Sequence, residues 1–116
     1  DNYSEDKKME QLIFGKNKDR FYMGESEDKA LAEVTFKKHK DNIIILDHTY
    51  VNRSLRGRGM GKILVDRVVS YARENNLKII PTCPFAKDIM EMSKVYADVL
   101  MSDATLKEVK DVVCPL

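Results

Sequence analysis

The alternation of apolar and polar residues in the first half of the chain predicts a meander of antiparallel strands. In the segment 30–38, apolar residues occupy the even positions from 32 to 36, and the odd positions from 31 to 37 are mostly polar. The segment 43–51 (IIILDHTYV) begins with a continuous apolar run, which indicates a central strand. The shorter apolar stretches 9–14 and 20–23 are separated by the turn sequence GKNKD and predict a hairpin.

The second half of the chain changes to helical spacing. Apolar residues recur every four positions from Met60 to Ala72, which predicts an amphipathic helix over 59–75, about 25 Å long at about 1.5 Å per residue. A strand is predicted at 77–83, and Pro81 indicates that this strand loses a neighbour near its end, because proline has no N–H to donate.

The remaining segments predict further helices. Pro84 suits the first turn of a helix over 84–92, Ser93 is placed to cap a short turn, and 103–113 has helical spacing. The order is a strand meander followed by strand, helix, strand and helix. This order predicts a mixed α/β fold in one domain.

Composition limits the class of protein. The chain has 116 residues, a length typical of one domain, and a net charge of +1, which argues against a protein built mainly to hold nucleic acid or a membrane surface. No apolar run approaches the roughly 20 residues of a membrane span, and no signal-peptide pattern opens the chain. Two distant cysteines do not form a disulfide framework, so we expect a reduced, cytoplasmic protein. Residues 1–8 are polar, and we expect them to be flexible.

The sequence RSLRGRGMGK at 53–62 holds three of the five glycines of the chain, just ahead of the predicted helix. A loop that enters a helix presents free backbone N–H groups at the positive end of the helix dipole, and this combination binds anions. Glycine lets a phosphate approach the backbone closely, and Arg56, Arg58 and Lys62 add positive charge. The loop therefore predicts a phosphate site, the alternative being a solvated turn whose arginines face water.

Two common phosphate motifs do not fit this loop. A Walker sequence would need a glycine at position 56 and a hydroxyl residue at 63, where the chain has Arg56 and Ile63. A dinucleotide fingerprint would need a third glycine where Lys62 stands. The remaining pattern is Arg-x-x-Gly-x-Gly over 56–61, between a strand and a helix.

This pattern resembles the pyrophosphate loop of the GNAT acetyltransferase superfamily, which binds acetyl-coenzyme A. The segments LDHTYV, RGRGMGKILVDRVVSYARENNLKIIPTCPFAK and VYADVL are similar to a small single-domain GNAT-like subfamily, over roughly residues 9–100. The resemblance implies an N-acetyltransferase with a minimal GNAT-like fold, in which the strands before and after the loop helix splay apart. Residues 101–116 lie beyond it, as a C-terminal extension without an assigned role.

The resemblance also implies how acetyl-coenzyme A would bind. The backbone of Thr49, Tyr50 and Val51 would hold the pantetheine arm as an added strand. The pyrophosphate would lie on the loop, whose implied binding residues are Arg56, Gly57, Arg58, Gly59, Met60, Gly61 and Lys62.

Cys83 is a candidate catalytic residue, because the resemblance places it near the acyl thioester. It could accept the acetyl group covalently, line the pocket while an amine attacks directly, or be a buried core thiol. A free thiol is only a few per cent thiolate at pH 7, so a nucleophilic role needs a lowered pKa, which the start of the following helix could supply.

His48 is the second candidate, as a base for an incoming ammonium or for a thiol. Strand alternation predicts that residues 44, 46, 48 and 50 share one face, so that His48 lies with Tyr50. A structural histidine bonded to backbone is the alternative. Tyr96 could be an acid for the leaving thiolate, although we favour a packing role, and Glu33 is the nearest strand carboxylate.

Other functions have weaker support. The cysteines and histidines show no paired ligand spacing, so no metal site is expected. A coenzyme A-binding module with little turnover is the main alternative to an enzyme. Nucleic-acid binding through Arg53, Arg56 and Arg58 lacks interleaved aromatic residues. The acceptor is expected to be a small-molecule or peptide amine, and the oligomeric state is left open.

Overall fold

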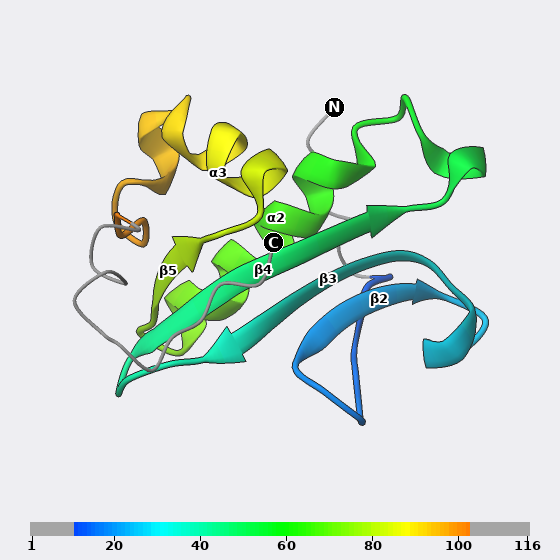
Figure 1. The fold of residues 1–116 in the computed structure, drawn as a ribbon, viewed down its shortest axis with the longest axis horizontal. Coiled ribbons are helices and arrows are strands. Elements are labelled where there is room, and N and C mark those ends of the chain that lie inside the picture. The colour runs from blue at the N-terminus through cyan, green and yellow to red at the C-terminus, as the bar shows by residue number, and fades with distance from the viewer. Residues whose placement is uncertain (1–10, 103–116) are drawn as a thin grey trace.

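The computed structural model of the chain describes residues 11–102 and contains one mixed sheet of five strands in the order β1-β2-β3-β4-β5 (Figure 1). The strands are β1 (Ile13–Phe14), β2 (Arg20–Gly24), β3 (Ala30–Lys38), β4 (Ile43–Val51) and β5 (Lys78–Pro81). The first four pair antiparallel, and β5 runs parallel to β4. The predicted meander is thus confirmed, with β3 and β4 at their predicted bounds.

The helices complete a mixed α/β fold. Helix α2 (Met60–Glu74) connects β4 to β5, as a parallel pair requires, and lies behind the sheet in Figure 1. Helix α3 (Pro84–Glu91) follows β5 directly, and its start is the predicted Pro84. Three short 3-10 helices are η1 (Glu27–Lys29), η2 (Arg53–Leu55) and η3 (Lys94–Tyr96). Ser93 caps η3 as predicted, by accepting from the N–H of Val95.

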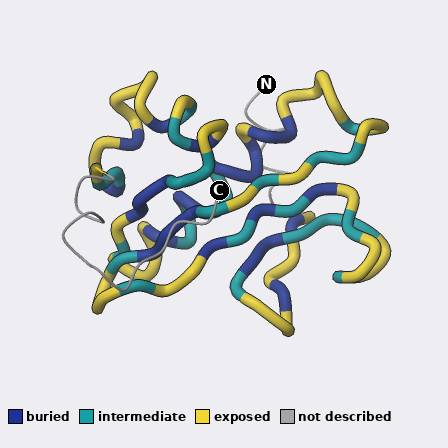
Figure 2. The backbone as a smooth tube through the Cα atoms, viewed as in Figure 1, coloured by how far each residue is buried: buried dark blue, intermediate teal, exposed yellow. Residues whose placement is uncertain are grey.

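The core lies between α2 and one face of the sheet, where the buried segments gather in Figure 2. On β3, the even-numbered Ala32, Val34 and Phe36 are buried, which confirms the predicted alternation. Helix α2 buries eight residues against them. Each large apolar side chain removed from water contributes about 1.5–3 kcal/mol, so this one interface carries much of the stability of the fold.

A β-bulge in β4 changes which side chains point toward α2. His48 pairs with Thr35 and Leu46 pairs with Phe36, so Asp47 is an extra residue between them. The bulge puts Thr49 and Val51, opposite Val34 and Ala32, on the core face with Leu46. The prediction that positions 44 and 46 share a face with 48 and 50 is therefore wrong, because strict alternation ends at Asp47. His48 and Tyr50 do share a face, and it is the face away from α2.

β4 and β5 separate after a short paired segment. The pairing joins Ile43–Leu46 to Lys78–Pro81 and ends there, and the N–H groups of Thr82 and Cys83 both point to the carbonyl of Leu46, at 2.9 and 3.3 Å. From Asp47 to Val51, β3 is the only described strand that pairs with β4. This fork is the splay that Pro81 predicted, although β5 ends two residues earlier than the predicted strand.

The far side of β5 is covered by the segment that follows η3. Leu100 forms a parallel bridge with Ile79, and the N–H of Met101 donates to the carbonyl of Ile79 at 2.8 Å. The expected flexible segment 1–8 and the expected helix over 103–113 lie outside the described residues. Within residues 11–102, no helix is both long and apolar enough to cross a bilayer.

Candidate active site

The glycine-rich loop enters α2 in a conformation that exposes its backbone. Gly57 and Gly59 have φ angles of +79° and +71°, in the left-handed region that favours glycine. Among residues 11–102, apart from the immediate chain neighbours, no atom lies within 4 Å of the position that a Cβ would take at either residue. Gly59 precedes the first turn of α2 and offers no side chain to cap it. The first N–H groups of α2 therefore have no capping side chain at Gly59, as the predicted anion site requires.

Hydrogen bonds within the loop hold it in place. The side-chain oxygen of Asn52 accepts from the N–H of Ser54 at 2.9 Å, which caps η2. The Nε of Arg56 donates to the carbonyl oxygen of Val51 at 3.1 Å. This bond links the loop back to the end of β4, so the Arg56 side chain shapes the loop as well as adding charge.

The loop forms one end of a cleft of about 610 Å³. Its other lining residues come from the open part of β4, from α2 and from α3. Every predicted coenzyme residue except Arg58 lines the cleft, in the set Thr49, Tyr50, Val51, Arg56, Gly57, Gly59, Met60, Gly61 and Lys62. Leu55, Phe85 and Ile89 line it as well. The structure thus brings the predicted residues together around one cavity, which is lined by loop backbone, by the cationic Arg56 and Lys62, and by apolar side chains.

Phe85 and Ile89 were missed by the sequence analysis, although one signal could have found them. They lie four residues apart on the predicted helix 84–92, and so on one face of it. The Phe85 side chain is 49% exposed, which is a large exposed fraction for a phenylalanine. Its ring covers Gly61, where an added Cβ would lie only 2.3 Å from the ring atom Cζ. Gly61 is therefore needed for close packing, unlike Gly57 and Gly59, which are needed for their φ angles.

Lys62 is the cationic side chain of α2 in the cleft. Its Nζ lies 2.7 Å from Oδ2 of Asp66, one turn further along α2. The other oxygen of Asp66 accepts the phenol proton of Tyr96 at 2.6 Å. Burial of the phenol, together with the Asp66 carboxylate, raises the pKa of Tyr96 to about 12. Tyr96 is 4% exposed and already donates to Asp66, so the structure supports the packing role rather than an acid that protonates a leaving group.

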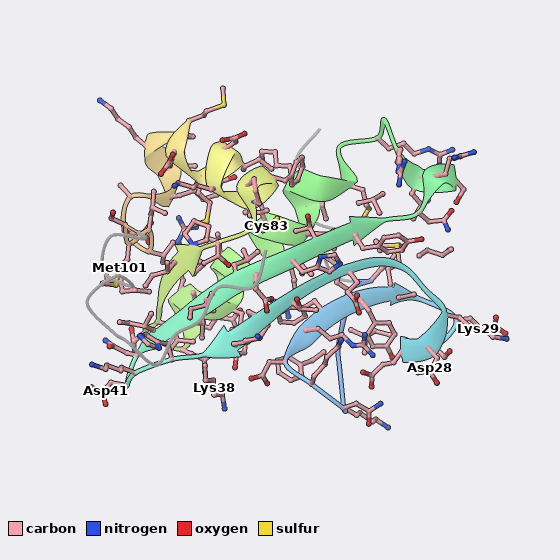
Figure 3. All side chains as sticks on the ribbon, in the orientation of Figure 1. Asp28, Lys29, Lys38, Asp41, Cys83 and Met101 are labelled. Atoms are coloured by element: carbon pink, nitrogen blue, oxygen red, sulfur yellow. The ribbon has the colours of Figure 1, made fainter. Side chains whose placement is uncertain are left out.

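Cys83 lies at the fork, at the N-cap position of α3 (Figure 3). Its sulfur is 3.6 Å from Oγ1 of Thr49, a residue of the open part of β4 that also lines the cleft. The thiol is partly buried and packs against the core. Thr49 therefore both lines the cleft and contacts the Cys83 thiol.

His48 is exposed on the sheet face away from α2, opposite Thr35. On the same face, Glu33 forms an ion pair with the buried Arg20, which also binds Glu27 through Nη2 at 2.7 Å. Glu33 is thus committed to a structural pair rather than directed at the cleft. Within the described part of the chain, no group of three or more histidine, cysteine or acidic residues could hold a metal ion.

Comparisons with known proteins agree with this geometry. The family described as GCN5-related N-acetyl-transferase matches residues 20–99, which include the loop, the fork and α3. A similar solved structure is the NMR solution structure of a GCN5-like protein from Staphylococcus aureus with a proposed N-acetyltransferase activity. That protein is 46% identical, with a TM-score of 0.66 over 78% of this chain and 87% of the other. No protein with a curated description matched the chain. The chain belongs to the family of GCN5-related N-acetyltransferases.

Proposed function

We propose that this acetyltransferase uses acetyl-coenzyme A as its acetyl donor and an amine as its acceptor. The single observation that carries the proposal is the mixed lining of the cleft. The left-handed glycines, the start of α2 and two cationic side chains line it together with apolar residues such as Phe85 and Ile89. Coenzyme A has the matching parts, since a pyrophosphate is joined to an uncharged pantetheine arm.

The open part of β4 supports the placement of the arm. Between Asp47 and Val51, the strand lacks a β5 partner, so its backbone groups on that side can pair with an added strand, although the carbonyl of Val51 already accepts from Arg56. The amide groups of pantetheine are suited to this pairing. With the pyrophosphate at Gly59 and the arm along β4, the thioester would extend toward Thr49 and the fork at Cys83.

The chemistry would then be a direct or a two-step transfer. In the direct route, the amine nitrogen attacks the thioester carbon, the C–S bond breaks, and the amine gives up a proton while the coenzyme thiolate takes one. Binding both reactants in one cleft supplies the proximity that such a bimolecular step needs. In the two-step route, the Cys83 sulfur attacks the thioester carbon, the C–S bond to coenzyme A breaks, and coenzyme A leaves as the thiol with the proton from Cys83. The amine nitrogen then attacks the acetyl-Cys83 thioester, the C–S bond to Cys83 breaks, and the Cys83 sulfur takes a proton from the amine. His48 remains the proposed base.

A coenzyme A-binding module with little turnover is the second candidate. The observation that favours it is the position of His48, which is exposed on the face away from α2, whereas Cys83 contacts Thr49 on the core face. A binding module needs only the loop and the cleft. Acetyl transfer to any amine, at a rate above the hydrolysis of acetyl-coenzyme A, would exclude the binding module.

Calorimetric titration with acetyl-coenzyme A, coenzyme A and ATP tests the donor. We expect saturable binding of both coenzymes and much weaker binding of ATP, because ATP has phosphates for the loop and no arm for the apolar side chains of the cleft. Equal binding of all three would show that the loop holds phosphate without selecting coenzyme A. If neither coenzyme binds, the proposed donor is wrong.

A further inference from the structure

The contact between Phe85 and Gly61 joins the two helices that border the cleft. Gly61 lies in the first turn of α2 and Phe85 in the first turn of α3. The ring lies so close to the α2 backbone that two of its atoms, Cζ and Cε2, would be 2.3 and 2.4 Å from a Cβ on Gly61. Gly61 is buried, and the same ring is half exposed toward the cavity that it lines.

We propose that Phe85 is a positioning residue, whose contact with Gly61 fixes the start of α3 and thereby the place and reactivity of the Cys83 thiol. The inference rests on the proposed function only in one respect, that coenzyme A is the molecule that occupies the cleft. The contact itself, and its effect on the thiol, belong to the protein alone.

The connection to the thiol is short. Cys83 is the N-cap residue of α3, two residues before Phe85, and the N–H of Lys87 donates to the carbonyl of Cys83 at 2.9 Å in the first turn. Backbone between the two residues is therefore fixed by helix geometry and by Pro84, whose φ angle cannot vary widely. A shift of the start of α3 therefore moves Phe85 and Cys83 together, whereas a small displacement of the ring end can be taken up by the side-chain torsions of Phe85.

Two side-chain contacts hold the start of α3 from different directions. Cys83 touches Thr49 on β4, and Phe85 touches Gly61 on α2. Three of these four residues, Thr49, Gly61 and Phe85, also line the cleft. A molecule that fills the cleft therefore meets residues of both contacts, and we expect its binding to change the reactivity of the thiol. Because Phe85 lines the cleft, its replacement should also change the affinity for that molecule.

A double-mutant cycle on Gly61 and Phe85 tests the proposal. It is made in a Cys114→Ser background, so that Cys83 is the only cysteine, and the rate of alkylation of Cys83 by iodoacetamide is measured with and without coenzyme A. Phe85→Ala removes the ring, and Gly61→Ala displaces it. Apart from the contact with Phe85, alanine fits at Gly61, because the backbone there is helical and has no positive φ angle.

Each single variant is expected to change the coenzyme-free alkylation rate by about fivefold or more, a difference of about 1 kcal/mol in activation free energy. In the Phe85→Ala background, Gly61→Ala should have little further effect, because no ring remains for its Cβ to meet. Additive effects of the two substitutions, or unchanged rates in both single variants, would overturn the proposal.

Two controls separate positioning from general loss of stability. Met92→Ala changes a side chain that is 85% exposed beyond the end of α3, and it should leave the rate unchanged. Val69→Ala opens a cavity in the buried face of α2, away from both contacts, and it should lower the melting temperature without a comparable change in rate. If Val69→Ala alters the alkylation rate as much as Phe85→Ala does, the thiol reports global opening and the proposal is wrong.

The alkylation measurements made with coenzyme A distinguish failure of this proposal from failure of the proposed donor. In the parent protein, coenzyme A should change the alkylation rate, and the change should be smaller in Phe85→Ala. If coenzyme A neither binds nor changes the rate in any variant, the proposed donor fails. The result of the coenzyme-free cycle still decides whether Phe85 positions Cys83.

Discussion

The hydroxyl oxygen of Thr49 lies 3.6 Å from the sulfur of Cys83, across the fork between β4 and β5. Thr49 points toward Cys83 only because the bulge at Asp47 turns it to the core face of β4. The pair joins the open part of β4 to the start of α3, where the proposed thioester would lie. The contact supplies the thiol with a hydroxyl neighbour that can donate or accept a hydrogen bond.

Replacement of Cys83 separates the two chemical routes. Cys83→Ala should bind coenzyme A normally, because the sulfur does not line the cleft. Loss of most turnover, with retained affinity, is the result expected for a covalent intermediate, and it is measured as coenzyme thiol released per minute with a panel of amines. Full turnover in Cys83→Ala would exclude the covalent route. Thr49→Val is the companion variant, because it keeps the shape of the Thr49 side chain and removes the hydroxyl that contacts Cys83.

Gly59→Glu should abolish coenzyme binding, because it places bulk and negative charge where the pyrophosphate would lie. The position has space for a side chain but a φ angle of +71°, so any non-glycine residue costs about 1–2 kcal/mol of backbone strain. Gly59→Gln carries the same strain without the charge and is the control. Calorimetry should show a larger loss for glutamate than for glutamine, and equal affinity of Gly59→Glu and the parent protein would contradict the loop assignment.

Arg56→Lys should weaken coenzyme binding although it keeps the positive charge. The Nε of Arg56 holds the carbonyl of Val51 at 3.1 Å, and a lysine ammonium lacks the planar fork that reaches this oxygen while still facing a phosphate. An affinity about three to ten times lower is expected, the size of one net hydrogen bond. Arg53→Lys is a suitable control on the same loop, because Arg53 does not line the cleft. Unchanged affinity in Arg56→Lys would mean that Arg56 supplies charge alone.

Tyr96→Phe should change the dependence of stability on alkaline pH. The pKa of Tyr96 is raised from 10.0 to about 12 in the folded protein, chiefly by burial and then by Asp66. A raised pKa stabilises the fold below pH 10, and this contribution is lost as pH rises from about 10 to about 12. It amounts to at most about 3 kcal/mol. Denaturant unfolding of both proteins across this range should show a steeper loss in the parent than in Tyr96→Phe. Parallel curves would show that the phenol is not specifically protected from ionisation.

His48→Gln tests the proposed base. Because His48 is exposed and does not line the cleft, the substitution should leave coenzyme affinity and melting temperature unchanged. If His48 removes a proton during transfer, turnover falls and the acidic limb of the pH–rate profile disappears. An unchanged profile would show that another group, or solvent, takes the proton.

The sequence predicted most of the fold, because its hydrophobic pattern is strong and local. The bounds of β3 and β4, the helix after the loop and the start of α3 at Pro84 followed from alternation, helical spacing and proline geometry. The loop was also predictable, since its glycines and arginines are adjacent in the chain. Six of its predicted binding residues line one cleft, together with the three predicted residues of β4.

What the pattern could not supply were relationships between distant segments. Strict alternation placed His48 on the same face as Leu46, whereas the bulge at Asp47 separates them, and a bulge depends on the register with β3. The roles of Phe85 and Gly61 were missed because the two residues are far apart in sequence and meet only when α2 and α3 pack together. By itself the sequence determined the elements and the glycine-rich loop before α2, through short-range propensity and periodicity. Only the tertiary structure decided which side chains face the cleft, because that depends on strand register, on the fork between β4 and β5 and on helix packing.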